Sequence, residues 1–471
     1  MRGHAQMRDV PKKISIEEWD KRYCELSASG MQQPAYGGPL RRHVGDGDLR
    51  LLKLRYDNSA ASLHLWNFLL TEEERLYQVR DEGKKIVGVM KDLGTIPVMA
   101  YSLPDVVAFY PDGAWWIPCV MELSAGLLGI ADSLGIDESF CPVRAMLGAF
   151  VTGSHFPKPD LLTCSVGATC DDFSAIAQRL NGLGYPILWW EIPSRRHPDP
   201  GERAIHLPGG FSAPESQVAF VKSELQRVRV ALETLTGNRL DDAALSEGIK
   251  MANQFRSLLS QLRELTFNAE VCPVPALEML IAEMFAIHFC SDRDEAIRVL
   301  KGLLSEVQSR VKAGKGVLGT DAVRVFWMNP VADLRVMELL EQCGGRVCGT
   351  EYLFCHALDE IPEGVAPMEA LARMALADPM VGSSGDRAAR ICSDIRKFGA
   401  EAMVISRIPG ASHCAVEGKV IGDIVRAKVG IPVLEFEVPP VSDSIESSLR
   451  NRLEALMETV KERRKRCTVR A

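Results

Sequence analysis

Residues 161–193 decide the fold, and they read LLTCSVGATCDDFSAIAQRLNGLGYPILWWEIP. The first five residues predict a short buried strand, and a loop then leads to Cys170. After it, apolar side chains recur at helical spacing: Phe173, Ile176, Ala177 and Leu180. Gly184 suits the end of that helix, and a proline leads into a second apolar run. The order strand, helix, strand predicts an α/β unit with a parallel sheet.

A second stretch repeats this pattern. Residues 402–439 read AMVISRIPGASHCAVEGKVIGDIVRAKVGIPVLEFEVP, with Cys414 in the place of Cys170 and Gly430 in the place of Gly184. The Cys-to-Gly separations are 16 and 14 residues. The helical spacing predicts a shared face: Val416, Val420 and Ile424. The sequence therefore predicts two similar α/β domains.

The chain has 471 residues, too many for one core, and its 46% hydrophobic and 25% charged residues are typical of a soluble globular protein. We expect an N-terminal, partly helical extension (1–85), a first α/β domain (86–212), a helical tract (213–320), a second α/β domain (321–440) and a C-terminal helix (441–471). Ser212 and Glu215 match a capping box that would start the helical tract.

The charge and the hydropathy of the chain limit the classes of partner that it is expected to bind. The net charge is −7 and no long basic block interrupts it, which argues against nucleic acid and anionic membranes. No apolar run approaches the ~20 residues of a membrane span, and the first residues lack the apolar region of a secretory signal. We expect a cytoplasmic protein whose 13 cysteines are reduced.

Three cysteines share one setting. Cys170 and Cys414 each lie between a predicted strand and a predicted helix, where parallel sheets bind ligands, and Cys141 precedes a proline suited to a first helical turn. A helix start is expected to lower a thiol pKa. Three thiolates and one open position suit an iron–sulfur cluster that binds substrate. The alternative is that each is a buried core thiol.

Other motifs are excluded. The chain contains no C-x-x-C, which removes thioredoxin-like, zinc-ribbon and bacterial-ferredoxin interpretations. The G-x-G-x-x-G match at residues 314–319 precedes a predicted strand, although the dinucleotide motif follows one, so we interpret it as a linker. Because G-x-x-x-x-G-K-[ST] is also absent, we expect this chain to bind no nucleotide.

In four places the chain resembles the 2-hydroxyacyl-CoA dehydratase family, which includes the core subunits of ATP-dependent benzoyl-CoA reductase. CPVR (141–144), PDLLTCSVGATCDDF (159–173) and AMVISRIPGASHC (402–414) resemble the three cluster-cysteine segments of that family. DDAALSEGIKMANQFR (241–256) resembles its helical stretch ending in N-x-x-R. The ordered set spans about residues 86–465.

The resemblance implies two Rossmann-like (flavodoxin-like) domains with a [4Fe-4S] cluster between them, held by Cys141, Cys170 and Cys414. It also implies a homologous second subunit and a separate ATP-hydrolysing iron–sulfur activator that delivers one electron. In dehydratases that electron turns the acyl-CoA thioester into a ketyl radical, which loses its 2-hydroxyl. In the reductase branch the same machinery reduces an aromatic ring. A third alternative is a subunit that relays electrons without touching substrate.

Five further residues are candidates near the site. Cys164 and Cys355 would gain importance if the cluster were a larger double-cubane type, although a buried strand cysteine is the simpler interpretation of Cys164. His413, Arg407 and Arg144 could contact the cluster or the substrate. The alternatives are a solvated loop residue for His413, a structural ion pair for Arg407 and a surface arginine for Arg144.

The helix after Cys170 begins with two acidic residues. Asp171 and Asp172 are expected to cap this helix and to compensate its dipole.

Overall fold

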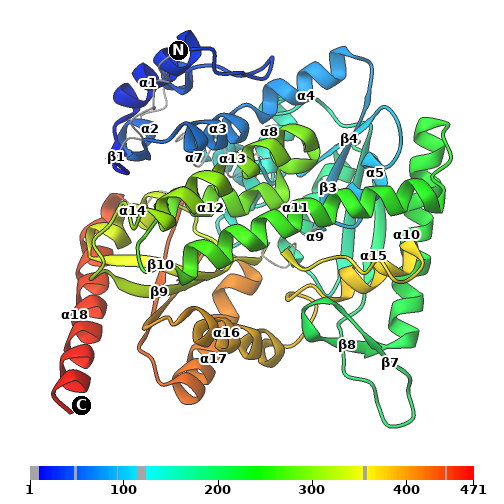
Figure 1. Ribbon diagram of the computed structural model, residues 1–471. Helices are drawn as coiled ribbons and strands as arrows, with labels where there is room; N and C mark the ends of the chain where they lie inside the picture. Colours follow the sequence, from blue (N-terminus) through cyan, green and yellow to red (C-terminus); the bar gives the residue numbers. More distant parts are fainter. Residues whose placement is uncertain are drawn as a thin grey trace.

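The computed structural model describes residues 10–46, 50–92, 94–113, 124–353, 358–440 and 443–470. Within them, two four-stranded parallel sheets lie among the helices (Figure 1). The first contains β3 (Lys85–Met90), β4 (Val106–Phe109), β5 (Leu161–Gly167) and β6 (Ile187–Ile192). The second contains β9 (Val323–Met328), β10 (Gly345–Glu351), β11 (Ala402–Arg407) and β12 (Val433–Glu437). The predicted α/β class with two parallel sheets is confirmed.

The two sheets have the same topology. Their strand orders are β4-β3-β5-β6 and β10-β9-β11-β12, so in each the second strand along the chain lies outside the first. This is the flavodoxin-like order, in which the winding reverses between the first and third strands. Ligands of such sheets bind beyond the carboxyl ends of those two strands. The ends of β3 and β5, and of β9 and β11, are therefore the positions where a site is expected.

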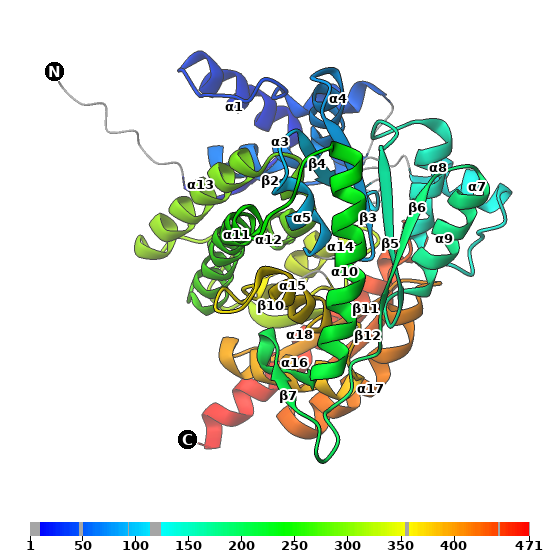
Figure 2. The same ribbon diagram turned by 90° about the vertical axis from the view of Figure 1, so that its right-hand side faces the viewer.

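Helices flank both sheets. Those that accompany the first sheet are α5 (Ile96–Tyr101), α7 (Ser124–Ser133), α8 (Ala145–Thr152) and α9 (Asp171–Gly182). Figure 2 shows α7, α8 and α9 gathered on one side of β5 and β6. Those that accompany the second sheet are α14 (Arg335–Gln342), α15 (Pro367–Leu376), α16 (Ser384–Phe398), α17 (Ser412–Val429) and α18 (Glu446–Arg470).

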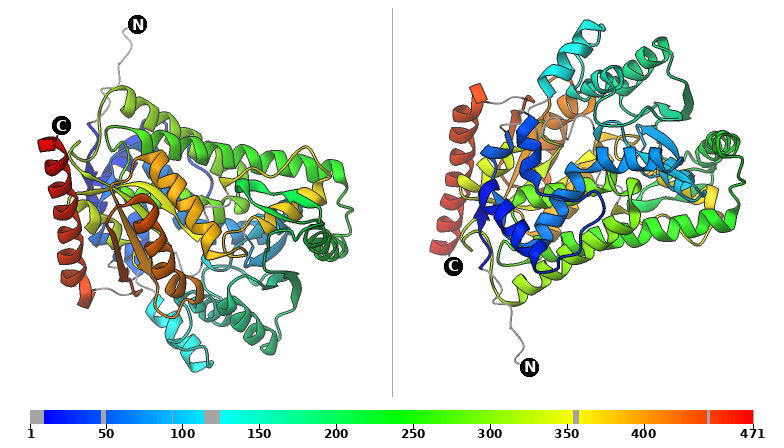
Figure 3. Two further views of the ribbon diagram at one scale, coloured as in Figure 1. Left: turned by 90° about the horizontal axis from the view of Figure 1, so that it is seen from below. Right: turned by 90° about the horizontal axis from the view of Figure 1, so that it is seen from above.

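The tract between the sheets is helical, as predicted. It contains α10 (Glu215–Thr236), α11 (Asp242–Asn268), α12 (Ala276–Met284) and α13 (Arg293–Lys312). Gly237, in the left-handed conformation, ends α10, and the Asp241 side chain caps α11 by accepting from the Ala244 N–H. Helices α10 and α18 lie on opposite sides of the molecule (Figure 3).

The N-terminal region packs against the helical tract. It contains β1 (Lys13–Ile14), α1 (Ile16–Ala28), α2 (Arg50–Lys53), β2 (Tyr56–Asp57), α3 (Ala60–Leu70) and α4 (Glu72–Asp81). Glu278 of α12 accepts hydrogen bonds from the Asp57 N–H at 2.9 Å and from Trp66 Nε1 at 3.1 Å. Arg310 of α13 pairs with Asp57, and its Nη2 lies 3.0 Å from Oδ1. These buried bonds join segments far apart in sequence into one packed unit.

The predicted capping box at Ser212 and Glu215 is wrong. Ser212 lies in β8 (Ser212–Pro214), which pairs antiparallel with β7 (Ala204–His206), and Pro214 precedes the first turn of α10 without a side-chain cap. In this two-stranded sheet, Ser212 pairs with His206. Pairing between strands has therefore overridden a local helix-start pattern.

The predicted shared face of the helix after Cys414 is wrong for two of its three residues, because only Ile424 packs against the core. Val416 and Val420 are 70% and 51% exposed, whereas Ile421 and Val425 are fully buried. Two glycines let α17 lie close to β11 and β12: a Cβ on Gly418 would come within 3.1 Å of Ile405, and one on Gly422 within 3.2 Å. The small residues, rather than the valines, thus determine which side of α17 faces the sheet.

Among the described residues, no helix combines the length and the hydropathy needed to cross a membrane.

Candidate metal centre

Three helix starts meet between the two sheets. Cys170 follows β5 and is the N-cap of α9, and Cys141 is the N-cap of a short 3₁₀ turn, Pro142–Arg144. Ser412 follows β11 as the first residue of α17, and Cys414 lies two residues further on in the same turn. Because β5 and β11 are the third strands of their sheets, both starts lie beside the positions where the winding reverses.

The carboxylate of Asp172 joins the three starts. Its Oδ1 accepts from the Cys141 N–H at 3.3 Å, and its Oδ2 accepts from both the N–H and the hydroxyl of Ser412 at 3.2 Å. The Cys170 thiol lies 3.4 Å from Oδ2 and 3.7 Å from the Ser412 hydroxyl. The expectation that Asp171 and Asp172 cap α9 is wrong, because Cys170 is the N-cap and no side chain caps this helix. Both carboxylates lie in its first turn, and the partners of Asp172 lie on three segments.

The backbone is also tightly packed here. Gly410 has a φ of +77°, and a Cβ at this residue would lie 2.5 Å from the Phe140 carbonyl oxygen and 3.0 Å from that of Glu138. Only glycine allows such a contact without displacement of backbone atoms. The loop before α17 is thus pressed against the segment that ends at Cys141.

Of the three candidate cluster cysteines, the two whose side chains are described are buried: Cys141 is 8% exposed and Cys170 is 9% exposed. Burial raises the pKa of Cys170 to about 11, and the nearby Asp172 carboxylate acts in the same direction. The expectation of a lowered pKa is wrong for the protein without metal. The Phe173 N–H in the first turn of α9 does lower the pKa, but desolvation outweighs it.

Cys164 and Lys91 lie near Cys170, within β5 and just after β3 respectively. Cys164 is fully buried on β5 opposite Met90, and burial raises its pKa to about 12. Lys91 directly follows β3, and its Nζ donates to Ser174 Oγ of α9 at 2.9 Å. Burial lowers the pKa of Lys91, while the thiols of Cys164 and Cys170 oppose that effect. Sequence reasoning missed this cation, although its position at the end of the first strand could have indicated it.

The two candidate arginines have structural partners. Arg144 is buried, and it donates to the Phe140 carbonyl at 3.0 Å and to Asp132 Oδ1 at 3.2 Å. Arg407 forms ion pairs along β12, at 3.4 Å to Glu435 and 3.2 Å to Glu437.

The remaining candidates fall outside what the structure describes. Cys355 is outside the described residues, as are the side chains of His413 and Cys414.

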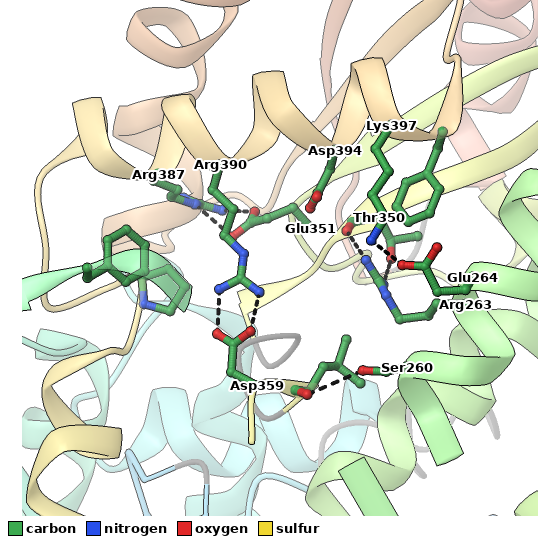
Figure 4. Close-up of a pocket in the computed structure, with 14 residues that line it drawn as sticks. Ser260, Arg263, Glu264, Thr350, Glu351, Asp359, Arg387, Arg390, Asp394 and Lys397 are labelled. Carbon is green, nitrogen blue, oxygen red and sulfur yellow. Dashed lines mark hydrogen bonds and ion pairs between the residues drawn. The ribbon is translucent and has the colours of Figure 1, made fainter. Parts of the chain in front are cut away.

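A polar cavity of about 150 Å³ lies between α11, β10 and α16 (Figure 4). Arg387 lines it and donates to Glu351 at 2.5 and 3.0 Å, to Asn329 at 2.6 Å and to Glu417 at 2.8 Å. Glu417 lies one helical turn after Cys414. The buried guanidinium of Arg387 thus connects the cavity wall with the helix that carries the third cysteine.

The N-x-x-R segment of α11 holds a neighbouring loop. Asn253 donates to the Ile361 carbonyl at 2.9 Å and accepts from its N–H at 2.8 Å, and Arg256 donates to the Asp359 carbonyl at 2.9 Å. Asp359 in turn pairs through both oxygens with Arg390 of the cavity. The motif therefore positions one wall of the cavity.

The donor set fits a metal cluster. No disulfide joins the described cysteines, and thiolates are the usual ligands of iron–sulfur clusters. The described side chains alone form no group of three His, Cys, Asp or Glu arranged around a metal, and the Cys414 side chain is not among them. With Cys414 at the start of α17, the donors would be three cysteines on three converging segments.

Fold and site together define a two-sheet α/β protein in which three cysteine-bearing segment starts meet between the sheets. The chain belongs to the family described as 2-hydroxyglutaryl-CoA dehydratase, D-component, which matches residues 107–460. The match includes all three site cysteines. A search of curated proteins found no match to the chain. Family membership makes the chain a component of a multi-component dehydratase system and identifies it as an enzyme subunit.

Proposed function

We propose that this chain is the iron–sulfur subunit of a 2-hydroxyacyl-CoA dehydratase, which converts an (R)-2-hydroxyacyl-CoA to an enoyl-CoA. The observation that carries the proposal is the convergence of the Cys141, Cys170 and Ser412 helix starts on one carboxylate. The family match supports the reaction class. The reaction removes the C2 hydroxyl and one C3 hydrogen as water, without net oxidation or reduction.

Cys141, Cys170 and Cys414 would hold a [4Fe-4S] cluster. When bound, the cluster supplies the one-electron chemistry that makes a 2-hydroxyl a feasible leaving group. The chain's own residues have three tasks. Asp172 orients the helix starts, burial of Cys141 and Cys170 excludes water, and Lys91 provides a positive charge beside the thiols.

The proposal includes two protein partners. One is a homologous second subunit, and the other is an activator that hydrolyses ATP, in agreement with the absence of G-x-x-x-x-G-K-[ST] from this chain. The substrate is an acyl-CoA that would reach the three cysteine-bearing segment starts between the sheets.

The test is anaerobic turnover of the purified complex. The chain, its partner subunit, activator, ATP and a reductant are incubated with (R)-2-hydroxyacyl-CoA esters, and the products are identified by mass spectrometry. We expect an enoyl-CoA, its loss in Cys170→Ala, and its retention in Cys392→Ala, which removes a buried thiol from α16. Conversion of benzoyl-CoA alone would assign the chain to the reductase branch. No turnover of either ester, together with a cluster whose four irons all have protein ligands, would favour the electron-relay alternative.

A further inference from the structure

Asp172 and Ser412 connect the two sheet-containing halves of the molecule. Asp172 lies in the first turn of α9, next to the first sheet, and Ser412 begins α17, next to the second. Two hydrogen bonds join them, and a third runs from the Cys141 N–H to the other oxygen of Asp172. Asp172 is 4% exposed, so these are buried, charge-assisted bonds.

Helix capping alone does not account for this arrangement. Asp171 occupies the same turn of α9, is exposed, and within the described part of the chain forms no hydrogen bond through its side chain. It carries the charge that favours a helix start. Asp172 carries the same charge but directs its oxygens to Cys141 and Ser412. A comparison of Asp171 with Asp172 therefore distinguishes the effect of a charge on the helix dipole from the effect of a contact between the two halves.

We infer that Asp172 and Ser412 form an interdomain clasp, which holds the two halves closed and sets the three cysteine-bearing segments in position before any metal binds. Asp172 is thus a positioning residue. The close contact of Gly410 with the Phe140 carbonyl lies beside the clasp and allows little sliding. The consequence for metal binding rests on the proposed function, whereas the clasp itself does not.

The experiment compares four forms of the full-length protein without metal by hydrogen–deuterium exchange: wild type, Asp172→Asn, Ser412→Ala and the control Asp171→Asn. Loss of a charge-assisted buried bond is expected to speed amide exchange at residues 408–418 and 138–145 by about tenfold. Asp171→Asn should match wild type, and Ser412→Thr, which keeps the hydroxyl, should restore slow exchange. Ser412→Ala keeps the proposal testable if Asp172→Asn fails to fold.

A second measurement uses the protein after its iron–sulfur cluster has been reconstituted. The rate of iron loss to a chelator should rise in Asp172→Asn and Ser412→Ala and remain unchanged in Asp171→Asn. Unchanged exchange in both variants without metal would overturn the clasp, even if wild type binds iron. Faster exchange in a protein that never binds iron would support the clasp and contradict the proposed function instead.

Discussion

Arg387 donates to Glu417 at 2.8 Å, one helical turn beyond Cys414, while the same guanidinium holds both oxygens of Glu351 at the end of β10. Arg387 is 2% exposed. Its ion pairs connect the second sheet, the cavity of Figure 4 and α17. The buried ion pairs of Arg387 therefore join α17, one helical turn beyond Cys414, to the end of β10.

Arg387→Met is expected to destabilise the protein without metal. It leaves the Glu351 carboxylate buried without its cation, which costs about 3–5 kcal/mol in the free energy of unfolding. The control is Arg390→Met, which breaks the partly exposed pair with Asp359 and should cost about 1 kcal/mol. Urea unfolding measures both. Equal losses in the two variants would contradict the role given to Arg387.

Glu278 should make stability depend on pH. Burial, and then the charge of Asp57, raises its pKa from 4.5 to about 8. Between pH 4.5 and 8 the folded protein therefore retains a proton that the unfolded chain releases, so the contribution of Glu278 to stability is greatest below pH 4.5 and is lost as the pH rises toward 8. In Glu278→Gln the thermal midpoint should depend less on pH across this window. Exposed Glu247→Gln is the control and should retain the wild-type slope.

Gly410→Ala should disturb the metal centre, and Gly430→Ala should not. Both glycines have a positive φ, at +77° and +79°, so an alanine at either costs about 1–2 kcal/mol. A Cβ at Gly430 would meet no atom within 4 Å, whereas one at Gly410 would lie 2.5 Å from the Phe140 carbonyl oxygen. Iron content after reconstitution is the measurement. Full iron in Gly410→Ala would show that this contact does not position the cysteines.

Lys91→Met should make the reduction potential of the bound cluster more negative, by roughly tens of millivolts, because a positive charge near the thiolates favours the reduced state. Lys84→Met, at the other end of β3 and paired with Glu82, is the control. A redox titration followed by electron paramagnetic resonance measures the shift. A potential equal to wild type in Lys91→Met would remove Lys91 from the site.

Much of the fold could be predicted from residues 161–193 and 402–439. Buried parallel strands are continuous apolar runs in the sequence. The helices that follow β5 and β11 end close to Gly184 and at Gly430. These local patterns are enough to predict β5, β6, β11 and β12. Their common strand order could not be predicted from those patterns, because pairing between β3 and β5 joins segments separated by other elements.

The site was harder to predict than the fold. The sequence indicates Cys141, Cys170 and Cys414, but Asp172 reads as a helix-start residue because Ser412 lies 240 positions away. Burial of the Cys170 thiol reverses the pKa shift expected from the helix dipole alone. The exposed face of α17, with Val416 and Val420, follows from glycine contacts that hydropathy does not register.

The most direct test of the central claim is the iron and acid-labile sulfide content of anaerobically purified wild type, Cys170→Ala and Cys392→Ala. We predict about four iron and four sulfide per chain in wild type and Cys392→Ala, with one distinct iron site by Mössbauer spectroscopy, and loss of the cluster in Cys170→Ala. Wild type without iron after anaerobic reconstitution, or full iron in Cys170→Ala, would contradict the assignment of Cys141, Cys170 and Cys414 as a three-cysteine cluster site.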